Sequence, residues 1–245
     1  MIGRIIWIGC VAVLGLVIAQ LQLDRQAARD PSLMEWVAAP FRGNSQFLAA
    51  TAALNAGDRP GGVEAARELL LRRPVPAENL TIYATALYRT GDEERASLAI
   101  QTAAQRGWRE PLAQEARLRL ALEAGDLGEA GTRYVALLLN PAADNVLLTT
   151  LGEQVLAEPG SEAETALAGL VSDTDRWHAT FLGRGLQVMP PAAFARVAVA
   201  SIARGTAFDC HALERVIGSL TARDAAAGQS MRTAALGKCP QLVQP

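Results

Sequence analysis

The sequence predicts an all-α fold, an α-solenoid of stacked helical hairpins preceded by a single N-terminal transmembrane helix. The first observation is composition: half of the 245 residues are apolar, Ala and Leu prevail, and only 5 % are aromatic. Such a composition favours helices, because Ala and Leu lose little on entering one. The second observation is a short sequence motif ending in Gly-Asp that occurs three times. The third is one long uncharged apolar segment near the N-terminus.

Charge and residue counts narrow the range of functions. The formal net charge is −2 and charges of both signs are interspersed, so no basic surface for nucleic acid is expected. Two histidines are too few for a multi-histidine metal site. The sequence also lacks a phosphate-binding loop and a dinucleotide fingerprint. We therefore expect a non-enzymatic protein with no metal, no cofactor and no nucleic-acid partner.

Residues 5–23 form the uncharged apolar segment. As a helix this segment would be about 28 Å long, close to the ~30 Å hydrocarbon core of a bilayer. We expect residues 1–24 to act as an uncleaved signal anchor; a cleaved signal, for which Val17-Ile18-Ala19 resembles the peptidase site, and a buried core helix are the alternatives. Arg4 precedes the segment, which favours a cytoplasmic N-terminus. The protein is thus expected in the bacterial inner membrane, single-pass, with a periplasmic C-terminal domain.

Residues 25–42 are expected to be a linker and entry helix. Asp30 can cap a short helix that begins at the following proline. Leu33, Trp36 and Val37 are expected to cover the open end of the helical array, because terminal repeats need such a cover. The alternative places Trp36 at the membrane interface, where tryptophan is common.

The three copies of the motif contain Gly57, Gly91 and Gly125, which are 34 residues apart. Each glycine lies between two apolar runs that are typical of helices. Glycine can take the left-handed conformation that ends the first helix, and the aspartate after it can cap the second. Setting each glycine at position 15 defines three repeats, at residues 43–76, 77–110 and 111–144.

The pattern resembles the tetratricopeptide repeat, over roughly residues 43–144. In the second repeat the apolar first-helix positions of that family hold Leu80, Tyr83 and Leu87. The resemblance implies a right-handed solenoid that binds proteins or peptides. Position 8 departs from the family pattern, and Leu118 at this position is expected to force the helices of the third repeat apart. The small residues that the family places at position 20 are Gly62, Ala96 and Ala130.

In tetratricopeptide proteins the concave wall is lined by first-helix positions 2, 5, 9 and 12. Carried over residue by residue, these are Asn44, Phe47, Thr51, Leu54, Glu78, Thr81, Thr85, Tyr88, Leu112, Glu115, Arg119 and Leu122. Their mixture of apolar and hydrogen-bonding side chains suits an extended peptide or a partner helix. Two alternatives stay open: the wall packs against other segments of this chain, or a partner binds another face.

Residues 145–245 are expected to hold a degenerate repeat and a C-terminal helical extension, without strands. Residues 144–157 and 161–171 are predicted to form a fourth hairpin, in which Ser161 and Glu164 make a capping box. Further helices are predicted to begin at residue 172 or 173 and to span residues 192–203, 209–222 and 229–236.

The stretch Asp209-Cys210-His211 contains residue types that cysteine hydrolases use. Adjacent residues on a helix point about 100° apart, so Cys210 and His211 are poorly placed to hydrogen-bond with each other. We expect Asp209 to cap a helix instead. Cys210 and Cys239 are the two cysteines outside the apolar segment, and an exported compartment permits a disulfide between them. Two inert buried thiols are the alternative.

The leading functional hypothesis is a membrane-anchored scaffold that binds a protein or peptide, in cell-envelope or polysaccharide-export assembly. A second hypothesis is a structural protein that forms only homo-oligomers, through the array or the apolar helix. A third is a carbohydrate-acting solenoid, although the sequence lacks the acidic cluster among aromatic residues that such an enzyme needs.

Overall fold

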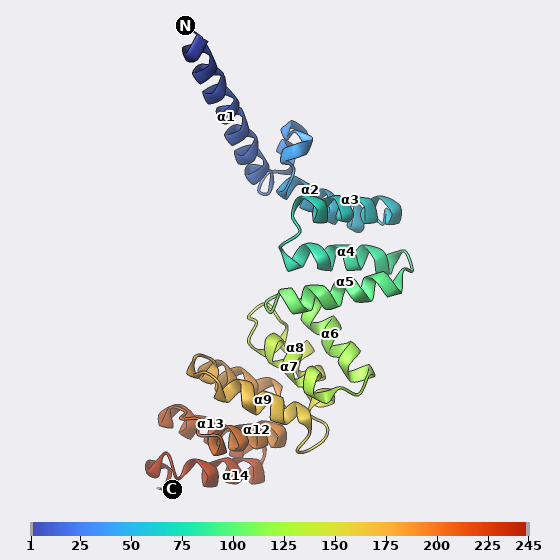
Figure 1. The fold of residues 1–245 in the computed structure, drawn as a ribbon. Coiled ribbons are helices and arrows are strands. Elements are labelled where there is room, and N and C mark those ends of the chain that lie inside the picture. Colours follow the sequence, from blue (N-terminus) through green and yellow to red (C-terminus); the bar gives the residue numbers. More distant parts are fainter. Residues whose placement is uncertain (1, 244–245) are drawn as a thin grey trace. The chain divides into compact units, whose positions relative to one another are not determined.

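The computed structural model describes residues 2–243. Within these residues all regular elements are helical and no strand is present, which confirms the all-helical prediction. The chain forms two compact units: the N-terminal unit ends at Gly107, and the C-terminal unit begins at Trp108. Figure 1 shows the helices in chain order.

The N-terminal unit begins with α1 (Ile2–Ala27), one continuous helix that is long and apolar enough to cross a bilayer. Its apolar side chains are exposed along most of its length; Ile5, for example, is 70 % exposed. The last turns differ, because Asp24 and Ala27 are buried. The helix therefore continues past residue 24 and ends within the folded part of the unit.

Asp24 joins α1 to the next long helix, α2 (Asn44–Asn55). Its carboxylate accepts hydrogen bonds from the backbone amides of Gly43, Asn44 and Ser45 at 2.8–3.1 Å, and from the Ser45 hydroxyl at 2.7 Å. The first amides of a helix have no partner within the helix, and here a side chain of another helix supplies the acceptor. α1 and α2 are thus connected by several charge-assisted hydrogen bonds.

Two short 3-10 helices lie between α1 and α2: η1 (Pro31–Trp36) and η2 (Ala39–Phe41). Asp30 caps η1 as expected, by accepting a hydrogen bond from the Ser32 amide at 3.1 Å. Val37 is buried, but the Trp36 side chain is 73 % exposed. The prediction that Trp36 covers the end of the array is therefore wrong, because Val37 at the end of η1 turns inward and Trp36 turns outward.

Two helical hairpins complete the N-terminal unit. Gly57 and Gly91 end the first helix of each hairpin in the left-handed conformation, with φ of 75° and 84°. Asp58 and Asp92 cap the second helices, each by accepting a hydrogen bond from the amide three residues later. Both roles confirm the prediction. Besides α2, the helices are α3 (Arg59–Arg72), α4 (Ala77–Arg89) and α5 (Glu93–Arg106).

The C-terminal unit begins with another hairpin, α6 (Pro111–Glu123) and α7 (Leu127–Leu138), which turns at Gly125 and is capped by Asp126. Leu118 on α6 is fully buried, yet the two helices pack along each other. Small residues such as Ala121 and Ala130 share its core cluster and leave room for it. The expectation that Leu118 forces these helices apart is therefore wrong.

The predicted fourth hairpin is not formed. Helix α9 (Glu162–Ser172) packs against α7 and α12 (Pro191–Ala203), whereas α8 (Asn145–Val155) packs against α7 and the short α11 (Leu186–Val188). A Cβ added at Gly131 of α7 would lie 2.7 Å from the Cα of Ala163 in α9, so the two backbones touch there. This close approach, which only glycine allows, brings α9 onto α7.

The prediction of a capping box at the start of α9 is also wrong, because Ser161 and Glu164 do not form the two hydrogen bonds that define it. Ser161 is the N-cap residue, but its hydroxyl is buried without a hydrogen-bond partner. Glu164 accepts a hydrogen bond from the Gly160 amide at 2.9 Å and forms an ion pair with Arg196 of α12, with Nη2 and Oε1 2.6 Å apart. The ion pair explains why the carboxylate lies away from the position that a capping box requires.

Residues 175–188 form one helical run close to the predicted position, and the hydrogen-bonding pattern changes along it from 3-10 to α, to π and back to α. The Arg184 guanidinium donates to the carbonyl of Asn140 at 2.6 Å and to that of Leu138 at 3.0 Å, which ties this run to the end of α7. Phe181 stacks on Phe194 with ring centroids 5.0 Å apart. The remaining elements are η3 (Asp175–Trp177), α10 (His178–Thr180), the π-helical η4 (Phe181–Gly185), α13 (Cys210–Arg223), α14 (Ala225–Ala235) and η5 (Pro240–Val243).

Candidate binding surface

The twelve residues predicted to line a concave wall differ widely in their exposure. The exposed ones are Glu78, Tyr88, Leu112 and Arg119. Those that are half-buried are Asn44, Phe47, Thr51, Thr85, Glu115 and Leu122. Leu54 and Thr81 are buried.

The expectation of a solvent-facing wall is wrong at Leu54 and Thr81. Leu54 belongs to the core cluster between the hairpin helices, where a Cβ added at Gly62 would lie 3.3 Å from its Cδ2 atom. The Thr81 hydroxyl donates to the carbonyl of Ala77 at 3.3 Å, so its polar group is satisfied within α4. Thr81 therefore serves packing, and Leu54 serves packing while it keeps 8 % exposure.

Asn44 is occupied by internal hydrogen bonds as well. Its side-chain nitrogen donates to the Asp24 carboxylate at 3.1 Å, and its side-chain oxygen accepts from Arg73 at 2.8 Å. These bonds hold the start of α2 against α1 and α3. Asn44 therefore stabilises the junction of α1, α2 and the end of α3 through its side-chain hydrogen bonds.

One open hollow of about 320 Å³ lies in the N-terminal unit, between the α2–α3 turn and the end of α4. Two residues of the predicted wall contribute to it: Leu54 forms part of its apolar floor, and Tyr88 stands beside it with 66 % of its side chain exposed. The lining residues are Leu54, Gly57, Asp58, Arg59, Tyr88 and Arg89.

The charged groups around the hollow differ in whether they already have hydrogen-bond or ion-pair partners within the chain. The Arg89 guanidinium donates to the carbonyl of Leu54, which joins α4 to the end of α2. The Asp58 carboxylate accepts the Gly61 amide at 3.0 Å as the cap of α3. Arg59 is exposed and pairs with no acidic group of the described chain. The hollow therefore offers an aromatic face, an apolar floor and a free guanidinium, a combination that suits a peptide bearing a carboxylate.

The sequence assigned Gly57 to the end of the first helix and Asp58 to the cap of the second, and it did not reveal Arg59 and Arg89 as lining residues. The signal that could have found them is the repeat itself, because the turn of one hairpin and the end of the next hairpin's first helix adjoin in stacked hairpins. Arg59 follows the capping aspartate, and Arg89 follows Tyr88. Neither residue stands at one of the four first-helix positions that line the concave wall in tetratricopeptide proteins.

In the C-terminal unit, the predicted wall residues lie on α6. Arg119 and Glu115 pair one helical turn apart, with Nη2 and Oε1 2.7 Å apart. Leu112 is 51 % exposed, and Leu122 packs at the edge of the core. An exposed pair of this kind contributes little to stability, so these side chains form a polar surface with one apolar position.

A second ion cluster joins α6 to α7. Glu129 accepts hydrogen bonds from Arg117 at 2.9 Å and from Arg133 at 3.0 Å. Burial alone raises the pKa of the Glu129 carboxyl, but the hydrogen bond from Arg117 and the charge and hydrogen bond of Arg133 outweigh it and hold the pKa below its ordinary value. The cluster therefore links the two helices of the hairpin.

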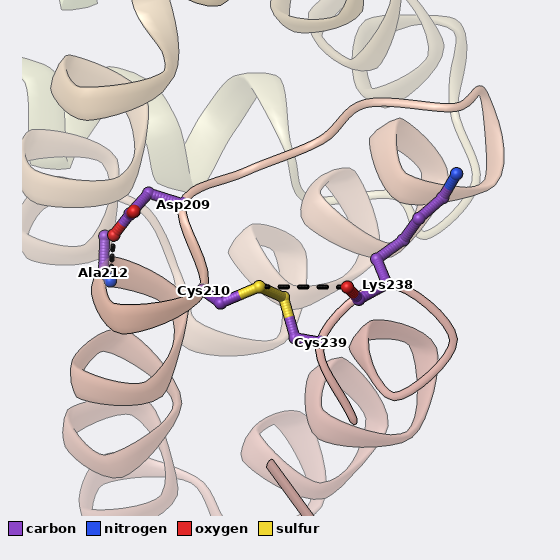
Figure 2. The surroundings of a disulfide bond; sticks show 5 residues. All are labelled: Asp209, Cys210, Ala212, Lys238 and Cys239. Carbon is purple, nitrogen blue, oxygen red and sulfur yellow. Dashed lines mark hydrogen bonds between the residues drawn. A yellow bond between two sulfur atoms is a disulfide. The ribbon is translucent and has the colours of Figure 1, made fainter. Parts of the chain in front are cut away.

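The stretch around Cys210 is structural in this fold (Figure 2). Asp209 caps α13 by accepting the Ala212 amide at 2.8 Å. Cys210 forms a disulfide with Cys239, with Cα atoms 5.6 Å apart, and Cys239 is fully buried. His211 is exposed. The bond links the start of α13 to the segment after α14, and the Cys210 sulfur is not a free thiolate.

Among residues 2–243, no three His, Cys, Asp or Glu side chains gather in a way that could hold a metal ion. A comparison of the chain with protein-family models, curated proteins and solved structures finds no match. The geometry of the hollow and of the hairpins is therefore the basis for a functional proposal.

Proposed function

We propose that this protein is a non-enzymatic, membrane-anchored scaffold whose hairpins form a right-handed, tetratricopeptide-like solenoid that binds a protein or peptide. The observation that carries the proposal is the hollow beside Tyr88 in the N-terminal unit. An exposed tyrosine next to an apolar floor and a free arginine matches the residue types that dominate binding energy at protein interfaces.

The partner that this surface fits is an extended peptide segment with an apolar side chain and a neighbouring carboxylate. The apolar group would lie over Leu54 and against the Tyr88 ring, and the carboxylate would accept hydrogen bonds from Arg59. Arg89 is held by the Leu54 carbonyl and so keeps the hollow in shape. The hollow is small, so it accounts for one anchor point of a larger interface.

The proposed setting is the periplasmic side of a bacterial inner membrane, in cell-envelope assembly. Helix α1 supports a single crossing of the bilayer by its length and its exposed apolar side chains. The Cys210–Cys239 disulfide supports an oxidising compartment for the C-terminal unit. Arg4 before the apolar stretch supports the orientation.

Site-specific photo-cross-linking in intact cells tests this proposal. A photoreactive residue at Tyr88 is expected to capture a protein through a segment with a carboxylate, and Arg59→Glu is expected to abolish the adduct by repelling that carboxylate. The matched control is the same photoreactive residue at Leu98 of α5, which is 60 % exposed in the same unit. Equal adducts at both positions, or none at Tyr88, would contradict the proposal.

Self-association through α1 is the second candidate function, because one observation favours it. A shallow apolar hollow of about 480 Å³ runs along α1, lined by Ile6, Gly9, Cys10, Val13, Leu14 and Val17. Cys10 is a free and exposed cysteine, so oxidative cross-linking in the membrane reports on pairs of α1 helices directly. A Cys10–Cys10 dimer that Gly9→Leu abolishes would support this function, and its absence would contradict it.

A further inference from the structure

The chain after α1 turns back toward the apolar part of that helix. The backbone amide of Ala38 donates to the side-chain oxygen of Gln20 at 2.8 Å, and both η1 and η2 pack against α1 (Figure 1, light blue beside the end of α1). Gln20 precedes Asp24 by one helical turn, which corresponds to about 6 Å along the axis. The segment of residues 31–42, which we call the entry segment, therefore lies beside the last turn of the apolar stretch.

The entry segment is held in this place from several sides. Val37 is buried, and its carbonyl accepts a hydrogen bond from Arg42 Nε at 2.8 Å. Arg72 of α3 donates to the carbonyl of Ala39. The Asp24 carboxylate of α1 holds the start of α2, which follows the entry segment in the chain. The segment is thus attached both to α1 and to the first hairpin.

A large aromatic side chain remains exposed on this fixed segment. Trp36 is 73 % exposed, although burial of a tryptophan in an apolar environment is strongly favourable. The short helix η1 that carries Trp36 packs against α1 and also carries the exposed polar residues Ser32 and Glu35. An indole at the boundary of an apolar and a polar region is in the environment that tryptophan prefers at membrane–water interfaces.

We propose that the entry segment is a membrane-interface element, which places the Trp36 indole among lipid headgroups beside the end of α1. The inference rests on the proposed crossing of the bilayer by α1, and it assigns the occupant of the exposed Trp36 surface as the bilayer itself. With α1 tied to α2 through Asp24 and to the entry segment through Gln20, these two connections would hold the first hairpin close to the membrane surface.

Fluorescence quenching by brominated lipids tests the proposal with the full chain in phosphatidylcholine–phosphatidylglycerol vesicles. The chain has four tryptophans, so three single-tryptophan variants are made in which the other positions are phenylalanine. Trp36 alone is expected to show a blue-shifted emission and stronger quenching by bromine near the headgroups than by bromine deep in the acyl chains. Trp108 alone is the control, and its emission is expected to be unaffected by either lipid.

Trp7 alone separates the two proposals, because it lies within the apolar stretch of α1. Quenching of Trp7 together with Trp36 supports the inference. Quenching of Trp7 with an unquenched, water-exposed Trp36 would overturn the inference and leave the anchor intact. An unquenched Trp7 would overturn the membrane crossing and the inference with it. Circular dichroism of each variant checks that the helical fold is retained.

Discussion

The N-terminal and C-terminal units bury their apolar side chains in different ways. The core cluster of the N-terminal unit consists of small and medium side chains: Ala50, Leu54, Ala66, Leu69 and Ala86. The cluster of the C-terminal unit continues through α7, α9, α12, α13 and α14, and it includes Tyr134, Phe181, Phe194 and Phe208. A disulfide adds a covalent link only in the second unit.

The difference shows how one helical chain can leave large side chains exposed in one unit and bury them in another. Alanine-rich contacts let the hairpin helices of the N-terminal unit approach closely, and large side chains such as Tyr88 and Leu98 then remain on its surface. In the C-terminal unit the tyrosine and the three phenylalanines of the core cluster turn inward, where each contributes more buried area. We expect the N-terminal unit to carry binding and the C-terminal unit to carry stability.

The largest effect is expected for Phe181→Ala. Phe181 is fully buried and stacks on Phe194, so its truncation leaves a cavity and should lower the free energy of unfolding of the C-terminal unit by about 3–5 kcal/mol. Hydrogen–deuterium exchange of the full chain in detergent follows each unit separately. Val146→Ala, at a 72 % exposed position, should change the free energy of unfolding of this unit by less than about 0.5 kcal/mol. Equal effects would contradict the described core.

Reduction of the disulfide is expected to have the next largest effect. The bond joins residues 29 apart in sequence, and the loss of its constraint should destabilise the C-terminal unit by roughly 3–4 kcal/mol. Amide exchange after treatment with a reductant should rise in α13 and α14 and stay unchanged in α2 to α5. Cys10→Ser serves as the control, because Cys10 is a free cysteine on α1. Unchanged amide exchange in α13 after reduction would contradict this prediction.

Asp24→Asn tests the junction in the N-terminal unit. Asparagine keeps the shape but removes the charge and one acceptor, which should cost about 1–3 kcal/mol in a buried, charge-assisted network. We expect faster amide exchange at the start of α2 and no change in the C-terminal unit. Asp30→Asn is a matched control, since Asp30 caps the exposed η1. Similar behaviour of the two variants would show that Asp24 does not hold α2.

The smallest effect is expected from the Glu129 cluster as pH falls. The pKa of Glu129 in the fold lies below its ordinary value of 4.5, so its stabilisation is present above that value and is lost as the pH falls through the lower pKa of the folded state. The loss should be below about 1 kcal/mol, because the cluster is partly exposed. Acid titration of unfolding should show a shallower decline for Glu129→Gln; an identical decline would contradict this assignment.

The sequence predicted local features of the fold well. Gly57, Gly91 and Gly125 take the left-handed conformation, and the aspartates after them cap the next helices, because turns and caps depend on a few neighbouring residues. Packing between distant helices was not predicted. The close contact of Gly131 with Ala163 brings α9 onto α7. Glycine and alanine are so frequent in this chain that neither residue type indicates where such a contact will form.

The candidate site was predicted only in part for the same reason. Tyr88 was expected on the surface and is exposed, whereas Leu54 and Thr81 were expected there and are buried. Family positions give the face of an idealised helix, but in this chain Leu54 packs closely against Gly62 of α3, and Arg89 bonds to the Leu54 carbonyl. Arg59 lies at the start of a second helix, outside the first-helix positions that defined the expected wall, and it lines the hollow because the hairpin turn adjoins the end of α4.

The most direct test of the central claim measures binding at the hollow beside Tyr88. The segment captured by the cross-link at Tyr88 is synthesised as a labelled peptide, and its fluorescence anisotropy is titrated with the full chain in detergent. Tyr88→Ala is expected to weaken binding by about tenfold or more, since an anchoring aromatic contributes about 2 kcal/mol, and Leu98→Ala is expected to leave it unchanged. Undiminished affinity of Tyr88→Ala, or an equal loss in Leu98→Ala, would contradict the assignment of this surface.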